Sequence, residues 1–351
     1  MTDAFVLPLI SWYRENRKSM PWREDPTPYH VWISEIMLQQ TRIEAAIPYY
    51  ERFLKALPDV QALAAVSEED LLKLWEGLGY YSRARNLKKA AMVIMERFGG
   101  VIPDDAESLR NLPGIGDYTA GAIASIAYGK PEPAVDGNVL RVMMRYTACN
   151  EDILEEKTRR RVRQELKEIY PAGQDAQRLT EALMELGEVI CLPNTVPQCE
   201  RCPLKALCEG KKQNRAAELP VRLVKTKKRT EEKTVLRLLA GGRMALRKRA
   251  DTGLLAGLWE LPNLPGHLTE NEVRDALAAQ GLNVLSAVPL GEGKHVFTHV
   301  TWLMTGYEVT LADPTGEYTW IDPARLTDAY AVPTAFRRFL PKISENGETK
   351  K

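Results

Sequence analysis

The chain has no excess of charge of either sign and no long hydrophobic run. Its 351 residues carry a formal net charge of +1, so a generally basic surface that would coat a nucleic acid is excluded, and any such contact must be local. No apolar stretch reaches membrane-spanning length, and the N-terminus lacks the pattern of a secretory signal. No internal repeat or low-complexity tract is evident. We therefore expect a soluble, intracellular protein, whose length favours two domains with ample cores.

Cysteine is scarce and is concentrated in one place. Of the five cysteines, Cys149 stands alone, whereas Cys191, Cys199, Cys202 and Cys208 follow one another closely. In a reducing compartment, thiols at such spacing indicate a metal or iron–sulfur site rather than disulfides. Zinc and a [4Fe–4S] cluster both accept four thiolates, so the spacing leaves both open. We expect Cys149 to be an ordinary buried thiol.

A change in composition divides the chain. Residues 1–210 show helical periodicity interrupted by proline and glycine, which predicts an all-α domain. Residues 211–233 are rich in Lys, Arg, Gln and Glu with little apolar content, which indicates a basic linker. Residues 234–345 contain short β-branched and aromatic runs and one helical pattern at 270–280. This second domain is therefore expected to be α+β.

The stretch from Leu112 to Arg141 joins a glycine turn, a helix of small residues and an aspartate. Pro113 lacks an N–H, and Gly114 and Gly116 permit positive φ, so the turn predicts a hairpin between two helices. Unpaired N–H groups at such a turn suit a phosphate. Asp136 then follows a proline-rich connection at the start of another helical segment. Together these features indicate chemistry on a nucleotide.

A second carboxylate lies in an apolar environment far upstream. The helix that begins near Pro28 places Glu35 on a face shared with Val31, Trp32 and Leu38. Desolvation there disfavours the charged form and raises the pKa of the carboxyl, which is what a general acid needs. The alternative, a helix glutamate paired with an arginine, remains open.

Three further segments each allow two interpretations. Tyr80 and Tyr81 precede two arginines, a combination that stacks on bases and holds phosphates, or that simply begins an exposed helix. The basic run at 157–163 is either a DNA contact or a solvated helix face, and the run at 222–233 is either a DNA contact or an exposed linker.

Taken together, these features resemble the helix-hairpin-helix DNA glycosylases and, within them, the adenine DNA glycosylase (MutY) family. The resemblance extends over nearly the whole chain. It rests on the segments WISEIMLQQT, GLGYYSRARNL, LPGIGDYT and PAVDGNV, on the cysteine loop, and on GLLAGLWELP and FTH near the C-terminus. It implies a multi-domain fold, with an all-α helix-hairpin-helix glycosylase region that carries an iron–sulfur cluster loop at 191–208, followed by an α+β Nudix-like domain that recognises 8-oxoguanine.

The resemblance also implies an activity, the excision of adenine mispaired with 8-oxoguanine or guanine in double-stranded DNA after the base has flipped out of the stack. It implies that Glu35 is the acid that protonates adenine N7 and that Asp136 is the carboxylate that stabilises the oxocarbenium-like sugar. It also implies that Tyr118 assists these two carboxyl groups. Relatives with lyase activity carry a lysine where this chain has Asp117 and Tyr118, so we expect a monofunctional enzyme. A monomer in the cytoplasm, at the bacterial nucleoid, is expected by the same resemblance.

The resemblance assigns recognition to further residues. The adenine pocket would be lined by Arg23, Leu38 and Glu181. The contacts with DNA and 8-oxoguanine would come from Gln40, Thr41, Leu78, Tyr80, Gly114, Gly116, Phe297, Thr298 and His299, with Thr298 in place of the family's serine.

Two departures from the family pattern bear on the cofactor and the distal domain. The family has six residues between the first two cysteines, whereas Cys191 and Cys199 are separated by seven. The insertion lies in a loop with prolines that can bulge, so we still expect a structural [4Fe–4S] cluster on Cys191, Cys199, Cys202 and Cys208. Nudix hydrolases bind magnesium through helix glutamates, but here Ala278 and Ala279 stand at that place. Methyl groups cannot bind a hard cation, so the domain is expected to bind rather than catalyse.

Three rival functions are less well supported. A nucleotide pyrophosphohydrolase centred on the distal domain conflicts with the alanines. A thymine or uracil glycosylase, or an abasic lyase, on the same scaffold conflicts with the missing lysine and the distal domain. A non-catalytic DNA-binding protein would leave Glu35 and Asp136 without a role.

Overall fold

The computed structural model describes residues 2–223 and 228–341, and the chain divides into two compact units. The first unit combines residues 1–66 with 85–224, and the second combines residues 67–84 with 225–351. The second unit is therefore discontinuous in sequence, since it takes a short segment from within the N-terminal half.

The expected linker at 211–233 has regular structure at both ends. Helix α13 (Glu209–Lys212) enters its start, and strand β1 (Arg229–Ala240) begins before its end. The first residues of β1 are mostly charged, and they form a strand because they pair with β6 from Arg229 opposite Val300 onward. Composition alone therefore indicates a linker where pairing with a distant strand produces regular structure. Residues 224–227 of the expected linker, and residues 342–345 of the expected distal domain, lie outside the described residues.

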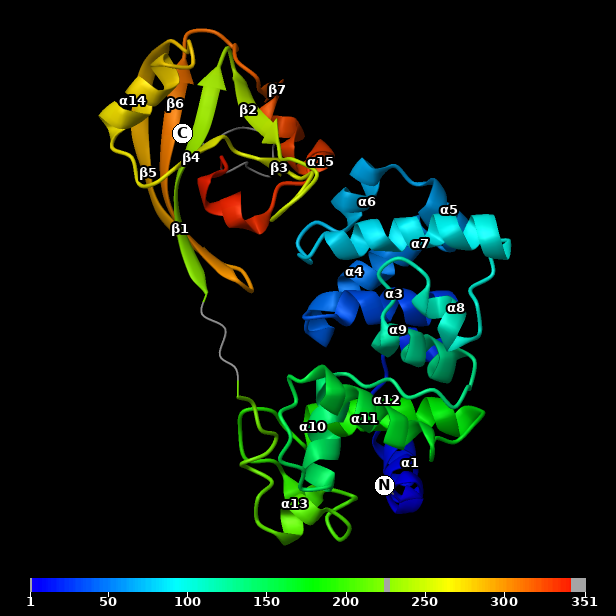
Figure 1. Ribbon diagram of the computed structural model, residues 1–351. Helices are drawn as coiled ribbons and strands as arrows, with labels where there is room; N and C mark the ends of the chain where they lie inside the picture. Colours follow the sequence, from blue (N-terminus) through cyan, green and yellow to red (C-terminus); the bar gives the residue numbers. More distant parts are fainter. Residues whose placement is uncertain (1, 224–227, 342–351) are drawn as a thin grey trace. The chain divides into compact units, whose positions relative to one another are not determined.

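The first unit is helical (Figure 1). Its N-terminal elements are η1 (Asp3–Phe5), α1 (Val6–Asn16), α2 (Pro21–Glu24), α3 (Pro28–Leu38), α4 (Ile43–Ala56) and α5 (Val60–Ala65). After the intervening segment, which contains α6 (Glu68–Leu74), follow α7 (Ser82–Phe98), α8 (Ala106–Arg110), α9 (Asp117–Ala122), η2 (Ile123–Ala127), α10 (Gly137–Tyr146), α11 (Glu156–Lys167), α12 (Gln174–Val189), η3 (Cys199–Arg201) and α13. Among the described residues, no helix is both long and apolar enough to cross a membrane.

Helix α3 is central to one half of this unit. The Thr27 hydroxyl accepts a hydrogen bond of 3.2 Å from the His30 N–H, and Pro28 occupies the first turn, so the start of the helix is well defined. Its side chains from Val31 to Met37 are all buried, and the helix packs against α4, α9 and η2. A helix apolar on nearly every side belongs inside a domain, so any polar group that it carries is desolvated.

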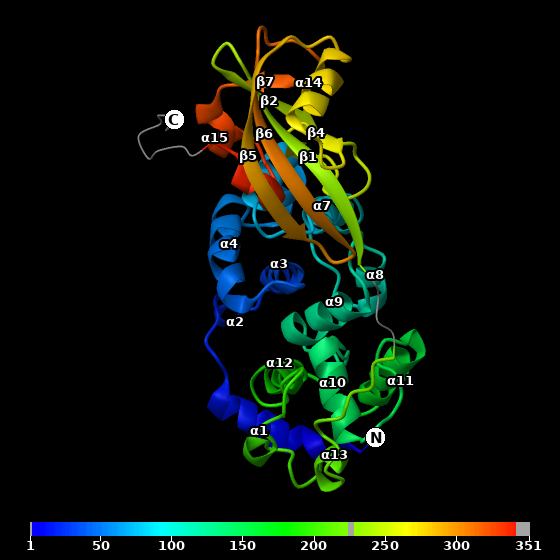
Figure 2. The ribbon, with the colours of Figure 1, turned by 90° about the vertical axis from the view of Figure 1, so that its left-hand side faces the viewer.

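The other half of the unit is built around α10 and α12, which lie side by side and pack against each other (Figure 2). Helix α1 packs against α12, and side chains from α1, α10, α11 and α12 share one apolar core. Helix α10 is strongly amphipathic by sequence, and its first turn is fixed by a cap on Asp136. The expected helix start at Asp136 is therefore present.

The glycine turn joins α8 to α9, as the sequence predicts. Gly114 has φ +77°, and a Cβ there would lie 2.6 Å from the Asn86 Cβ, so both backbone and space require glycine. At Gly116 no atom lies within 4 Å of an added Cβ, so this side of the turn is open. Within α9, a Cβ on Gly121 would lie 2.4 Å from the Pro133 carbonyl oxygen. The proline-rich connection therefore runs directly against α9 and brings Asp136 close to that helix.

The C-terminal part of the second unit is a mixed seven-stranded sheet with the central order β3-β2-β1-β6-β5 (Figure 1). Its strands are β1, β2 (Arg243–Lys248), β3 (Trp259–Glu260), β4 (Asn263–Pro265), β5 (Val284–Val296), β6 (Val300–Leu311) and β7 (Thr319–Ile321). Strands β1 and β6 are parallel, whereas β5 and β6 form an antiparallel hairpin. The β-branched and aromatic stretch over 295–309 is divided between β5 and β6, which are separated by residues 297–299.

Each face of the sheet has its own core. Helix α14 (Glu270–Ala278) covers one face through Val273 and Leu277. The other face is covered by the C-terminal segment with η4 (Pro323–Arg325), α15 (Leu326–Ala329) and η5 (Thr334–Phe339). Alternation of side chains along the strands supplies both cores, which confirms an α+β domain.

Candidate active site

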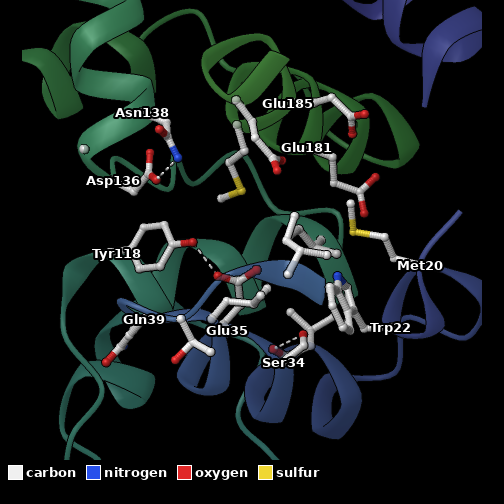
Figure 3. A pocket seen from close by; sticks show the side chains of 18 of the residues that line it. Met20, Trp22, Ser34, Glu35, Gln39, Tyr118, Asp136, Asn138, Glu181 and Glu185 are labelled. Atoms are coloured by element: carbon white, nitrogen blue, oxygen red, sulfur yellow. Dashed lines mark hydrogen bonds between the residues drawn. The ribbon is translucent and has the colours of Figure 1, made fainter. Parts of the chain in front are cut away.

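A cavity of about 810 Å³ lies in the helical unit, lined by side chains from α2, α3, α9, α10 and α12 (Figure 3). Eight of the residues expected to act on DNA line it together. They are Arg23, Glu35, Leu38, Gln40, Thr41, Tyr118, Asp136 and Glu181. Segments that are far apart in sequence therefore meet at one site.

Glu35 is one of the buried acids of the cavity, with 7 % of its surface exposed. Burial raises the pKa of Glu35 to about 7, and the charges of Asp136 and Glu181 act in the same direction. A hydrogen bond from Tyr118 and the charge of Arg23 oppose this rise. The carboxyl group can therefore hold a proton near neutral pH and release it to a leaving group.

Asp136 has a different environment, because donors hold its carboxylate. It caps α10, where one oxygen accepts the Val139 N–H at 2.7 Å and the other accepts the Asn138 side-chain amide at 2.9 Å. Burial raises the pKa of Asp136 above its ordinary value, although these hydrogen bonds and the charge of Arg141 offset part of the rise. The cavity thus contains one carboxyl group set up as a proton donor and one hydrogen-bonded to support negative charge.

Tyr118 connects α9 to α3. Its hydroxyl donates a hydrogen bond to Oε2 of Glu35, and in Figure 3 the ring lies between the acid and Asp136. Burial, and the negative charge of the two neighbouring carboxylates, raise the pKa of the Tyr118 phenol well above its ordinary value. The phenol therefore remains neutral and acts as a fixed donor.

The far wall of the cavity contains a buried ion pair that sequence reasoning missed. Arg23 contacts Oε2 of Glu185 at 2.6 Å, and Glu185 has a side chain only 1 % exposed. The Arg23 Nε lies 4.0 Å from Glu181, which also accepts a hydrogen bond of 2.7 Å from the Tyr13 hydroxyl. One feature of the sequence points to Glu185: it lies one helical turn after Glu181 on α12, so the two carboxylates share one face of the helix.

The second unit contains another group of predicted residues. Leu78 is buried and Tyr80 is 44 % exposed, both in the 67–84 segment. The Tyr80 hydroxyl shares a hydrogen bond with the hydroxyl of Thr298 in the β5–β6 turn. Thr298 and His299 are exposed in that turn, and Phe297 packs edge-on against Trp302 with 4.9 Å between ring centroids.

Two of the residues expected to contact DNA adopt unusual backbone conformations. Gln40 has φ +58° and Tyr80 has φ +47°, both in the left-handed region that favours glycine. Such strain, typically about 1–3 kcal/mol, is retained where surrounding structure enforces it and often marks binding segments.

The four clustered cysteines converge on one small cavity, together with the cationic side chains of Arg145, Lys205 and Lys211. All are half-buried free thiols, and Nη1 of Arg145 lies 3.4 Å from Sγ of Cys191. Within residues 2–223 and 228–341, no three His, Cys, Asp or Glu side chains are arranged to hold a single ion. A single tetrahedral zinc ion would bring its four sulfur ligands to about 3.8 Å from one another. In a [4Fe–4S] cluster each iron binds its own cysteine, so the four sulfurs do not have to meet at one ion. Four thiols around one cavity, with cations to balance their charge, fit the donor set of a cluster.

Cys149 lies apart from this cavity. It follows α10, is half-buried rather than fully buried, and its sulfur lies 3.3 Å from a guanidinium nitrogen of Arg161.

Comparison with known proteins identifies both regions. Residues 33–172 match the family described as HhH-GPD superfamily base excision DNA repair protein, and residues 234–342 match the NUDIX domain. A solved structure of a thermostable thymine-DNA glycosylase is 27% identical, with a TM-score of 0.55, over 60% of this chain and 96% of that one. A non-covalent endonuclease III–DNA complex has a TM-score of 0.51 at 24% identity, over 61% of this chain and 98% of that one, and shows the fold alone.

Curated relatives match over most of the chain. The adenine DNA glycosylase of Rattus norvegicus is 33% identical, over 92% of this chain and 73% of the relative. The adenine DNA glycosylase of Buchnera aphidicola subsp. Baizongia pistaciae is 33% identical, over 86% of this chain and 84% of the relative. With a helix-hairpin-helix glycosylase region followed by a Nudix-like domain, the chain is a DNA glycosylase that belongs to the adenine DNA glycosylase family.

Proposed function

We propose that the protein hydrolyses the N-glycosidic bond of adenine mispaired with 8-oxoguanine or guanine in double-stranded DNA. The observation that carries this proposal is the pairing, in one cavity, of a proton-bearing Glu35 with a hydrogen-bonded Asp136. The names of the relatives support adenine as the base that is removed.

In the proposed reaction, adenine flips out of the duplex into the cavity, at a cost of roughly a few kcal/mol. Glu35 donates its proton to adenine N7, and the electrons of the C1′–N9 bond move to the departing base. Asp136 stabilises the positive charge that develops on the sugar. Water then adds to C1′ and gives a proton to the Glu35 carboxylate, which restores the acid. Tyr118 holds the carboxyl of Glu35 in place throughout.

Recognition of adenine is proposed for Arg23, Leu38 and Glu181. Arg23 supplies N–H donors, Glu181 supplies a carboxylate acceptor for an exocyclic amine, and Leu38 supplies an apolar surface for the ring. All three line the same cavity as the two catalytic carboxyl groups, which supports this assignment.

Recognition of the opposite base is proposed for residues of both units. In the first unit, Gln40 and Thr41 line the cavity at the end of α3, and the turn with Gly114 and Gly116, which is open at Gly116, suits a backbone phosphate. In the second unit, the Tyr80 and Thr298 hydroxyls contact each other, beside Phe297 and His299 at the turn. Leu78 is buried here, so its insertion into a duplex requires a change of rotamer or backbone.

The proposed cofactor is a structural [4Fe–4S] cluster held by Cys191, Cys199, Cys202 and Cys208. When bound, it cross-links the chain around α13 and takes no part in the bond-breaking steps above. The protein is proposed to act as a monomer at the bacterial nucleoid.

Single-turnover release of the base tests the proposed activity. The substrates are duplexes with adenine opposite 8-oxoguanine, adenine opposite guanine, thymine opposite guanine, or uracil, and a separate abasic duplex tests strand cleavage. We expect release of adenine only, fastest opposite 8-oxoguanine, without efficient β-elimination, because Asp117 and Tyr118 offer no amine for a Schiff base. Release of thymine or uracil, or efficient strand cleavage by the purified protein, would refute the corresponding part of the proposal.

A further inference from the structure

Helix α11 carries the basic run at 157–163, and the structure separates its cations into two groups. Three of the cations form ion pairs with carboxylates on α11 or just before it. These pairs are Lys157 with Glu155, Arg160 with Glu156, and Arg161 with Glu151 and Glu165. The other two, Arg159 and Arg163, are one helical turn apart and therefore share one face of the helix.

Arg159 stands at the catalytic cavity. Its side chain lines that cavity and is exposed to solvent, and among the described residues it has no carboxylate partner. A nucleotide that enters the cavity stays attached to its strand through the phosphates on either side of its sugar. Those phosphates must lie at the rim of the cavity, where Arg159 is placed.

Arg163 stands at the helical hairpin. It forms an ion pair with Asp117, the first residue of α9, and the Asp117 carboxylate also lies 3.6 Å from a guanidinium nitrogen of Arg110. The Asp117 and Arg163 side chains are 44% and 31% exposed, but Nη1 of Arg163, which faces Asp117, is buried, so an anion gains this nitrogen only by replacing the carboxylate. One carboxylate therefore lies between two arginines at the start of α9.

We propose that Arg159 and Arg163 form a second phosphate-binding face beside the hairpin, and that Asp117 is a counterion that Arg163 exchanges for a phosphate of the strand carrying the target nucleotide. This inference rests on the proposed function only in that the cavity receives a nucleotide from duplex DNA. It adds α11 to the DNA contacts and gives the acid at position 117 a role in setting affinity.

Binding to a duplex with adenine opposite 8-oxoguanine, measured at several salt concentrations in a Glu35→Gln background so that the base stays attached, tests the role of Arg159. Arg159→Gln is expected to weaken binding several-fold and to reduce the slope of log affinity against log salt by about 0.9, the value for one lost phosphate contact. Arg160→Gln is the matched control, since Arg160 lies on the same helix, is 74% exposed and is paired with Glu156. It is expected to leave affinity and slope unchanged. Equal effects of the two substitutions would overturn the role of Arg159.

A double-mutant cycle tests the exchange at Asp117. Asp117→Asn is expected to tighten binding of the same duplex, because Arg163 no longer has to leave a carboxylate. In an Arg163→Gln background this gain is expected to vanish, whereas a gain of the same size would show simple relief of charge repulsion and overturn the exchange. Binding needs no base release, so these results are separate from the proposed chemistry. A wild-type protein that bound DNA as described but released no adenine would contradict the proposed glycosylase activity and leave the phosphate-binding face intact.

Discussion

The Tyr118 hydroxyl on α9 donates a hydrogen bond to the Glu35 carboxylate on α3. This contact opposes the rise that burial and the charges of Asp136 and Glu181 cause, so the Glu35 pKa of about 7 reflects desolvation that one hydrogen-bond donor and the charge of Arg23 partly offset. Glu35 is therefore half protonated near the pH at which it has to act.

The first prediction concerns pH. Because catalysis needs the protonated form of Glu35, kcat/KM for adenine release is expected to fall tenfold per pH unit above about pH 7. Tyr118→Phe removes the donor that lowers the Glu35 pKa, so the alkaline limb should move to higher pH. Rates measured from pH 5 to 9 for both proteins check this. An alkaline limb that stays in place would exclude control of the acid by Tyr118.

The second prediction concerns the acid itself. Glu35→Gln removes the proton and leaves size and hydrogen bonding nearly unchanged, so adenine release should fall by at least about 10²–10⁴-fold, the usual contribution of a general acid. Binding of an adenine:8-oxoguanine duplex should remain close to that of the wild type. Retained release at neutral pH would show that another group supplies the proton.

The same carboxyl predicts a stability effect with a definite sign. Its folded pKa of about 7 lies above the ordinary value of 4.5, so the neutral form stabilises the fold. This contribution is fully present below about pH 4.5 and is lost as pH rises through about 7. Glu35→Gln should remove this pH dependence, which thermal melts between pH 5 and 8 can measure.

The third prediction concerns Glu185, whose buried carboxylate contacts Arg23 at 2.6 Å. Glu185→Gln leaves the guanidinium with a neutral partner, so Arg23 should lose its fixed position and the single-turnover rate should fall more than duplex affinity does. A loss of stability of about 3–5 kcal/mol is the upper expectation for breaking a buried pair. Glu188→Gln is the control, because Glu188 is 39% exposed and lies 3.8 Å from Lys18. Equal effects at the two positions would contradict the role of Glu185.

The fourth prediction concerns the opposite base. Thr298→Ala combined with His299→Ala removes polar groups from the β5–β6 turn, including the hydroxyl that contacts Tyr80. The preference for adenine opposite 8-oxoguanine over adenine opposite guanine should decrease, while release opposite guanine stays nearly constant. The ratio of the two single-turnover rates measures this. A ratio equal to that of the wild type would show that the β5–β6 turn does not recognise 8-oxoguanine.

The fifth prediction concerns the cysteines. Iron and acid-labile sulfide should be present in equal amounts, with a broad absorption band near roughly 400 nm from thiolate-to-iron charge transfer. Cys202→Ala should lose that band and destabilise the region around α13. Stoichiometric zinc in the purified protein would instead assign a different metal to the same thiols.

Local patterns along the chain predicted the features that depend on neighbours in sequence. The glycine turn, the helix around Glu35 and the helix start at Asp136 follow from propensity and periodicity, and the structure contains all three. Strand β5 was not recognised, because its Gly and Pro residues resemble a loop and its partner β6 supplies the pairing. Glu185 is not predicted for a similar reason, since only the packing of α12 brings it to the cavity. The basic run at 157–163 is a candidate DNA contact by sequence, but the sequence does not show that Arg159 within it lines the cavity.

The discontinuity of the second unit has a consequence for proteolysis. The polypeptide passes between the two units three times, at residues 66–67, 84–85 and 224–225. Within the second unit, the Lys73 ammonium donates to the Tyr330 carbonyl at 3.2 Å, and Glu76 accepts the Val332 N–H at 3.2 Å. A single nick near residue 224 would therefore leave a fragment that still carries residues 67–84, and with them a set of contacts that can retain the severed C-terminal piece. Two fragments on a denaturing gel should elute together as one species from a sizing column.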